Sequence, residues 1–369
     1  MKRDPYKHKE RFENWIESVE KCKEVDGMNE INSKLFLLFI QDSRLGLNVS
    51  KGSKKGERSF IRLNTMRGKV AFVIKSIEEK GIPDIRKVKA EDMHNLFSDM
   101  RSGKRCTKYG TPYKSTGDYI KDFKTFWHWY QKVMKKENTL IPDITEDLDT
   151  RGEKPKFVYF TQKDFEQVLS QASYDIKPIV ALAYDSGARV TELLNVRVSD
   201  FTHNYSELNI RDEVSKTFGR RIKLMLCTDQ VREFVNKYGL NNNDYISQKS
   251  LVEINHELRE IAKSVFSTEQ IKYKNLTLKD FRHSSACFWL PRYKSESAMK
   301  YRFGWKKSDM IHYYTEFLGM KDTITQDDMY VDITKTELEK EVDRLRNDMH
   351  ILKESVMELI TIAKERSIV

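Results

Sequence analysis

The 369-residue chain lacks the features that mark membrane, secreted and zinc-binding proteins. It contains no run of about eighteen apolar residues, which excludes a membrane-spanning helix. Residues 1–15 lack the apolar stretch of a secretory signal, so we expect a protein of the cytoplasm. The four cysteines are widely scattered and form no C-x-x-C pair. This distribution argues for reduced thiols and against both a disulfide framework and a structural zinc site.

Two further signatures of catalytic sites are missing. There is no GxxxxGK(S/T) phosphate loop, and neither carboxylates nor histidines cluster along the chain. The sequence therefore carries no motif for a bound nucleotide, metal ion or other cofactor.

What the chain does contain is an excess of basic residues. Its 66 Lys and Arg outnumber its 56 Asp and Glu, which gives a net charge of +10. Two explanations fit that charge equally well: it keeps the protein soluble, or it binds a polyanionic partner. The distribution favours the partner, because glycine-broken basic runs over residues 51–58 and 101–110 are typical of loops that grip a nucleic-acid backbone. The candidate DNA-contacting residues of these runs are Lys51, Lys54, Lys55, Arg58, Arg101, Lys104, Arg105 and Lys108.

The chain divides into segments with different periodicity. Residues 1–136 have apolar positions at helical spacing, which predicts an all-α domain. Residues 137–160 mix proline, glycine and charge without a period, as a linker does. An approximate capping box at Thr161 predicts the start of a second domain over residues 161–330. Alternating apolar residues there predict a small β-sheet, so the fold class is mainly α with a small sheet (α+β).

Two motifs open the second domain. In "GARVTELL", Arg189 follows a glycine break and Glu192 lies one helical turn later, where it can orient the arginine. An ordinary structural ion pair would have the same spacing. Further on, alternating apolar residues flank a polar turn and predict a β-hairpin whose tip carries Lys216, Arg220 and Arg221. The tip is either a solvated basic turn or a site where a lysine reaches DNA and donates a proton.

Two more motifs follow. "KDFRH" puts Lys279, Arg282 and His283 within about one helical turn, beside an apolar run. Such a group of cations is costly to bury unless an anion arrives. "FGWKKSDMIHYYTEF" has Trp305 after a glycine and a tyrosine nine residues later. Adjacent tyrosines in a helix usually mean one ring in the core and one at the surface.

Taken in this order, the four motifs resemble those of the catalytic domain of the tyrosine recombinases. The whole chain resembles an archaeal integrase or a Xer-type member of that family. The resemblance covers about residues 30–320 and makes the basic first half the family's helical core-binding domain. One position departs from the family: its second box normally begins with histidine, where this chain has Lys279. The residues that match are Arg189 and Glu192 in the first box, Lys216 in the hairpin, Arg282 and His283 in the second box, and Trp305 and Tyr314 in the last.

The resemblance implies a site-specific recombinase or integrase that cuts and rejoins DNA through a 3′-phosphotyrosine, without metal or ATP. Tyr314 would be the nucleophile and Tyr313 its packing or phosphate-facing neighbour. Arg189 and Arg282 would stabilise the transition state, Lys216 would protonate the leaving 5′ oxygen, and Trp305 would buttress the phosphate. In their support, Lys279 would bind phosphate or act as an acid, with Glu192 and His283 assisting. Double-stranded DNA is then the partner, with a tetramer on DNA and a nucleoid-associated location.

Two alternative functions remain open on the sequence. The chain could be a DNA-binding relative with impaired catalysis, a reading that Lys279 encourages. It could also nick and reseal DNA like a type IB topoisomerase, with a similar residue set and no strand exchange.

The tail, residues 335–366, predicts a coiled-coil helix. Leucine fills the d positions 338, 345, 352 and 359, while Val, Met, Val and Ala fill the a positions 342, 349, 356 and 363. This pattern favours two parallel strands and therefore a dimer. A single helix packed on its own domain is the alternative, and Ile360 and Ile362 leave room for a higher oligomer.

Overall fold

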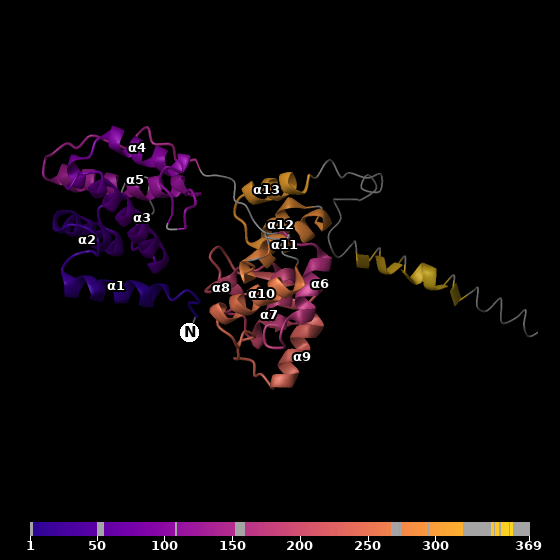
Figure 1. Cartoon of the computed structure of the whole chain (residues 1–369). Coiled ribbons are helices and arrows are strands. Elements are labelled where there is room, and N and C mark those ends of the chain that lie inside the picture. The colour runs from indigo at the N-terminus through magenta and orange to yellow at the C-terminus, as the bar shows by residue number, and fades with distance from the viewer. Residues whose placement is uncertain are drawn as a thin grey trace, which may run out of the picture. The chain divides into compact units, whose positions relative to one another are not determined.

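The computed structural model describes residues 3–49, 55–107, 109–151, 159–266, 273, 275–293 and 295–319, and residues 341–342, 344–346, 348–353 and 355–356 of the tail (Figure 1). It divides into two compact units, Met1–Ile311 and His312–Val369. The first unit holds two separate hydrophobic cores, one formed by residues up to 148 and the other by residues from 160 onward. The two cores therefore lie in separate stretches of the chain.

The first core is built mainly from helices. Serine or asparagine caps begin two of its helices, because the side chains of Asn29 and Ser59 accept hydrogen bonds from backbone N–H groups of the first turn. The central helix α5 buries a wide aromatic face that includes Phe123, Phe126 and Trp127. The elements are α1 (His8–Cys22), α2 (Glu30–Leu45), α3 (Phe60–Glu79), η1 (Ile85–Lys87), α4 (Ala90–Ser102) and α5 (Thr116–Lys136).

The helical domain extends further than predicted. Ile144 and Leu148, which fall in the expected linker, are 9% and 5% exposed and belong to the helical core. The indole of Trp127 also donates a hydrogen bond to the carbonyl of Pro142, at 2.9 Å. The boundary at residue 136 is therefore too early. The prediction missed it because two apolar side chains in an irregular, charged segment produce no periodic pattern.

The second half combines helices with a small antiparallel sheet. The strand order is β1–β2–β3, and Leu208 of β2 lies opposite Ile222 of β3 on the buried face. Mainly helical structure with a small sheet confirms the predicted fold class. The elements are α6 (Gln162–Gln171), α7 (Lys177–Ser186), α8 (Val190–Leu193), η2 (Val198–Asp200), β1 (Phe201–Thr202), β2 (Glu207–Ile210), β3 (Arg220–Lys223), α9 (Thr228–Tyr238), α10 (Leu251–Val265), α11 (Leu278–Trp289), η4 (Leu290–Arg292), α12 (Glu296–Phe303) and α13 (Asp309–Leu318).

Helix α7 is the centre of this half and is buried on all sides from its second residue onward. Near its end, Asp185 is fully buried and accepts backbone N–H bonds from Met225, Leu226 and Cys227. The other carboxylate oxygen of Asp185 accepts from the buried Arg302 at 2.9 Å. This one carboxylate therefore ties α7 to the start of α9 and to α12, and a buried charge needs such partners. Sequence reasoning did not single out either Asp185 or Arg302.

In the tail, the described residues are helical and all exposed. The coiled coil stays a prediction. None of the helices that the structure describes is long and apolar enough to span a membrane.

Candidate active site

Arg189 is positioned by a sharp turn between α7 and α8. Helix α7 ends at Gly187, whose φ of +59° is a left-handed conformation that favours glycine. A Cβ there would lie 2.2 Å from the ring of Phe303, so no larger residue fits without a shift. Two residues later Arg189 is the N-cap of α8, and its side chain is 23% exposed. The predicted helix–glycine–helix arrangement is therefore present.

Glu192 binds both the backbone and the side chain of Arg189, as the spacing of the two residues predicted. It accepts from the Arg189 backbone N–H at 2.8 Å and from Nη1 at 3.1 Å. It also accepts two bonds from Arg220, Nη1 to Oε1 at 3.2 Å and Nη2 to Oε2 at 2.8 Å. Burial by itself would raise the pKa of Glu192, but Arg220 and Arg189 outweigh it and lower the pKa to about 2. Glu192 is thus a carboxylate at any physiological pH.

The predicted place of Arg220 at an exposed hairpin tip is wrong. Arg220 lies in β3 with 2% exposure, whereas the side chain of its neighbour Arg221 is 76% exposed. Side chains along a strand alternate between faces, so Arg220 shares the buried face of Ile222. The period of two was visible in the sequence and would have identified Arg220 as the inward-facing arginine. Its burial is tolerated because Glu192 neutralises it.

Three arginines converge on the C-terminal end of α12. The last carbonyls of a helix have no partner within the helix and carry partial negative charge, so cations are favoured there. Here three consecutive carbonyls each accept from a different arginine. The bonds are Arg220 Nε to Arg302 O at 2.8 Å, Arg282 Nη2 to Phe303 O at 2.7 Å, and Arg189 Nη2 to Gly304 O at 2.9 Å. This arrangement, which we call the arginine turn, brings together two predicted catalytic residues from segments far apart in sequence.

Lys216 is exposed in the β2–β3 connection, and its two neighbours are tied to the arginine turn. The hydroxyl of Ser215 donates to Glu192 at 3.0 Å. The hydroxyl of Thr217 donates to the Gly304 carbonyl at 3.1 Å. The lysine is therefore free to reach outward while the backbone on both sides of it is held.

Helix α11 presents the second predicted box. Arg282 also donates through Nη1 to the carbonyl of Gly187, so it bridges the ends of α7 and α12. Lys279 is exposed, one turn before His283. Burial lowers the pKa of His283 to about 4, and the charges of Lys279 and Arg282 lower it in the same direction. His283 is thus neutral near pH 7.

Trp305 follows the arginine turn directly. It is 8% exposed and stacks on Phe303 with 4.7 Å between the ring centroids. The guanidinium carbon of Arg282 lies 5.4 Å from the Phe303 ring centroid and 5.9 Å from that of Trp305. Both aromatic rings therefore help to hold Arg282 in place.

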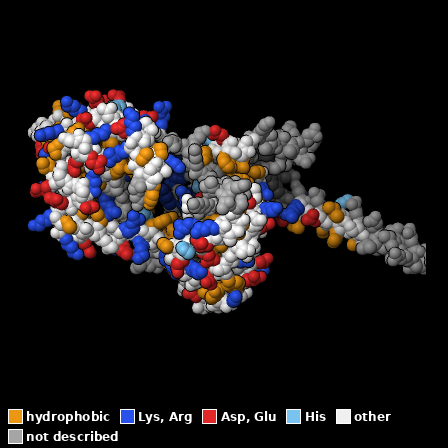
Figure 2. All heavy atoms as spheres, in the orientation of Figure 1, with side chains coloured by type: hydrophobic (Ala, Val, Ile, Leu, Met, Phe, Trp, Pro, Cys, Tyr) orange, Lys and Arg blue, Asp and Glu red, His pale blue; other side chains and the backbone are white. Residues whose placement is uncertain are grey.

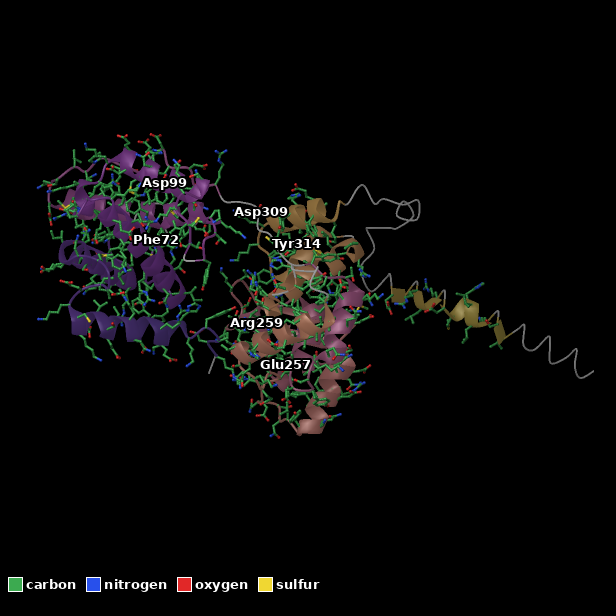
Figure 3. The ribbon with its side chains drawn as sticks, viewed as in Figure 1. Phe72, Asp99, Glu257, Arg259, Asp309 and Tyr314 are labelled. Atoms are coloured by element: carbon green, nitrogen blue, oxygen red, sulfur yellow. The ribbon has the colours of Figure 1, made fainter. Side chains whose placement is uncertain are left out.

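The two tyrosines of the last motif lie in α13, which carries Asp309 at its start and Tyr314 near its middle (Figure 3). Tyr314 is 1% exposed, whereas Tyr313 is half-buried. Their rings meet edge to face at 5.5 Å between centroids. Both residues belong to the second compact unit. The asymmetry between them agrees with the sequence expectation of one core ring, and it is Tyr314 that is in the core.

The basic loops of the helical domain have mixed surroundings. Lys55 and Lys104 are exposed and Arg58 is partly buried, while Lys51, Lys54 and Lys108 lie outside the described residues. Arg101 pairs with Asp149 at 3.3 Å and Arg105 with Glu79 at 2.6 Å. On the face drawn in Figure 2, basic and acidic side chains are interspersed over this domain. Surface pairs of this kind are weak, so a phosphate can displace the carboxylate.

Within the described ranges, no group of three or more His, Cys, Asp or Glu is arranged to hold a metal ion. No protein-family model matches the sequence, and no curated protein matches it either.

Solved structures do match the fold. The lambda integrase tetramer bound to a Holliday junction matches at 13% identity over 79% of each chain, with a TM-score of 0.55. The XerH site-specific recombinase in a post-cleavage complex matches at 13% identity over 70% of this chain and 77% of its own, with a TM-score of 0.54. The Tn1549 transposon integrase with circular-intermediate DNA matches at 13% identity over 80% of this chain and 97% of its own, with a TM-score of 0.51. The chain therefore has the fold of the tyrosine recombinases and integrases.

Proposed function

We propose that the protein is a site-specific DNA recombinase or integrase that cuts and rejoins DNA through a 3′-phosphotyrosine. The observation that carries the proposal is the arginine turn, in which Arg189 and Arg282 donate to adjacent carbonyls at 2.9 and 2.7 Å. Two rigidly held guanidinium groups beside each other suit the non-bridging oxygens of one phosphate. The similar fold of DNA-bound recombinases and integrases supports it.

In the proposed reaction, the oxygen of Tyr314 attacks the scissile phosphorus. A phosphorus–tyrosine bond forms, the bond to the 5′ oxygen breaks, and Lys216 gives that oxygen a proton as it leaves. Arg189 and Arg282 stabilise the negative charge that builds up in the transition state, and they need no reorganisation to do so. Rejoining is the reverse sequence, in which a 5′ hydroxyl attacks the phosphotyrosine.

Lys279 and His283 have different roles in this proposal. Lys279 is exposed and holds a phosphate oxygen by charge. His283 has a pKa of about 4, so at neutral pH it is an uncharged imidazole. A neutral imidazole can accept the proton that Tyr314 gives up, whereas a protonated lysine cannot.

DNA as the proposed substrate implies a cytoplasmic location with the nucleoid.

Covalent capture tests the proposal. The protein is incubated in EDTA with a pool of randomised duplexes that each carry one nick, and protein–DNA adducts are resolved on a denaturing gel. We expect an adduct with the natural protein and with Tyr313→Phe, its matched control, and none with Tyr314→Phe. An adduct lost in Tyr313→Phe instead would contradict the choice of nucleophile.

The same assay separates the alternatives. The captured sequences are rebuilt as intact duplexes and as supercoiled plasmids. Joint products between two duplexes support the recombinase. Relaxation of the plasmid without joint products indicates a topoisomerase-like enzyme, and binding with no adduct at all indicates a catalytically impaired DNA-binding protein.

A further inference from the structure

The described residues of the tail carry an exposed apolar stripe. Its described a and d positions are 40% to 67% exposed: Val342, Leu345, Met349, Leu352 and Val356. Figure 2 shows hydrophobic side chains in the open along this helix. Five apolar side chains in one continuous stripe on a helix indicate a surface that another helix covers.

The charges beside the stripe select the orientation of that partner. The g positions carry Glu341 and Asp348, and the e positions carry Arg346 and Lys353. In a parallel pair, g of one strand faces e of the other five residues on, so Glu341 meets Arg346 and Asp348 meets Lys353. In an antiparallel pair, g would face g and e would face e, which sets acid against acid and base against base. Only the parallel pair is attractive at all of these positions.

We propose that the tail binds the tail of a second copy of this chain as a parallel, in-register, two-stranded coiled coil. Leucine at d with valine at two of the three described a positions is the composition that favours two strands over three or four. The proposal needs no DNA and does not depend on the proposed catalytic activity. It predicts that the protein is a dimer before it meets DNA.

A parallel dimer has a consequence for DNA binding. Both chains enter the coiled coil from the same end, so the two DNA-binding parts are tethered to each other. Once one of them is bound, the other is held at a high local concentration near the same DNA. Two adjacent half-sites are thereby bound at a lower protein concentration than two independent monomers would need.

The first test is the mass of the full-length protein in solution without DNA, measured by light scattering. We expect twice the chain mass of 43.7 kDa. Leu352→Glu puts a charge at a d position and should return the mass to that of one chain. Ile351→Glu is the matched control: Ile351 is 60% exposed and Leu352 67%, but Ile351 lies at a c position outside the stripe, so the dimer should persist.

The second test addresses orientation. Leu352→Cys places two thiols opposite each other only in a parallel, in-register pair, and mild oxidation should then give a covalent dimer. The natural chain, with its exposed Cys22 and Cys106, and an Ile351→Cys variant serve as controls and should not cross-link. A monomeric natural chain, a dimer unaffected by Leu352→Glu, an oligomer larger than two chains, or a Leu352→Cys variant that does not cross-link would each overturn the proposal.

Discussion

Replacing Arg220 with leucine removes the buried partner of Glu192 and leaves a carboxylate with 0% exposure facing an apolar side chain. Breaking a buried pair by removing one member costs about 3 to 5 kcal/mol. The lower end of that range applies here, because Arg189 Nη1 still pairs with Glu192 at 3.1 Å. The pKa of Glu192 gives an independent magnitude. It lies at about 2 instead of 4.5, and at about 1.36 kcal/mol per unit the folded surroundings, with burial opposed by Arg220 and Arg189, favour the charged form by a net of about 3 kcal/mol.

The assay is urea unfolding of the full chain, followed by hydrogen exchange of the β2 and β3 amides, which reports on this core separately from the helical one. We expect Arg220→Leu to lose about 3 kcal/mol and Arg221→Leu, its exposed neighbour in β3, to lose less than about 0.5 kcal/mol. Adding Glu192→Gln to Arg220→Leu removes the buried charge that has lost its Arg220 partner and should recover part of the loss. A loss below about 1 kcal/mol in Arg220→Leu, or no recovery in the double variant, would refute the reasoning.

The pH dependence checks the same pair. Because the pKa of Glu192 is depressed on folding, its contribution is fully present above pH 4.5 and is lost as the pH falls through about 2. The natural chain should therefore lose stability over that window more steeply than Arg220→Leu. Parallel curves for the two proteins would argue against the pairing.

Three further predictions concern His283, Gly187 and Lys216. The pKa of His283 is depressed from 6.5 to about 4, so its contribution to stability is present above pH 6.5 and falls by about 3 kcal/mol as the pH drops from there through 4. His283→Gln should flatten the plot of unfolding free energy against pH over that range. An unchanged slope would contradict the pKa shift. Gly187→Ala should lower the free energy of unfolding in urea by about 3 kcal/mol, because its Cβ clashes with Phe303. Gly239→Ala has a similar φ of +58° and open space around it, so it should lower that free energy by only about 1 kcal/mol. Equal losses would mean that backbone strain alone acts. Lys216→Ala should slow DNA cleavage by a factor of about 10² to 10⁴ without weakening DNA binding. A substrate with sulfur at the 5′ bridging position should restore the rate, because its thiolate leaves without a proton. If the rate is not restored, Lys216 is not the acid.

Much of this protein followed from the sequence by itself. The helical first half, the small sheet and the Arg189–Glu192 pair all depend on the spacing of neighbouring residues, which backbone geometry converts directly into faces and turns. The exposed position of Lys216 also followed from the sequence, since a polar turn that joins two alternating apolar strands lies at the surface. The tail stripe is likewise a property of heptad spacing.

The tertiary structure alone decided how these pieces meet. Strand alternation could place Arg220 on the inward face, but only the structure shows its partners, a carboxylate 28 residues earlier that neutralises it and a carbonyl 82 residues later that binds it. The pairing of Arg189 with Arg282 at one turn depends on the end of α12, whose carbonyls lie 115 and 21 residues away in the chain. The low pKa of His283 arises from burial among segments that come together only on folding. Local spacing cannot encode such features, because desolvation and charge pairing depend on which distant residues fill the space around a side chain.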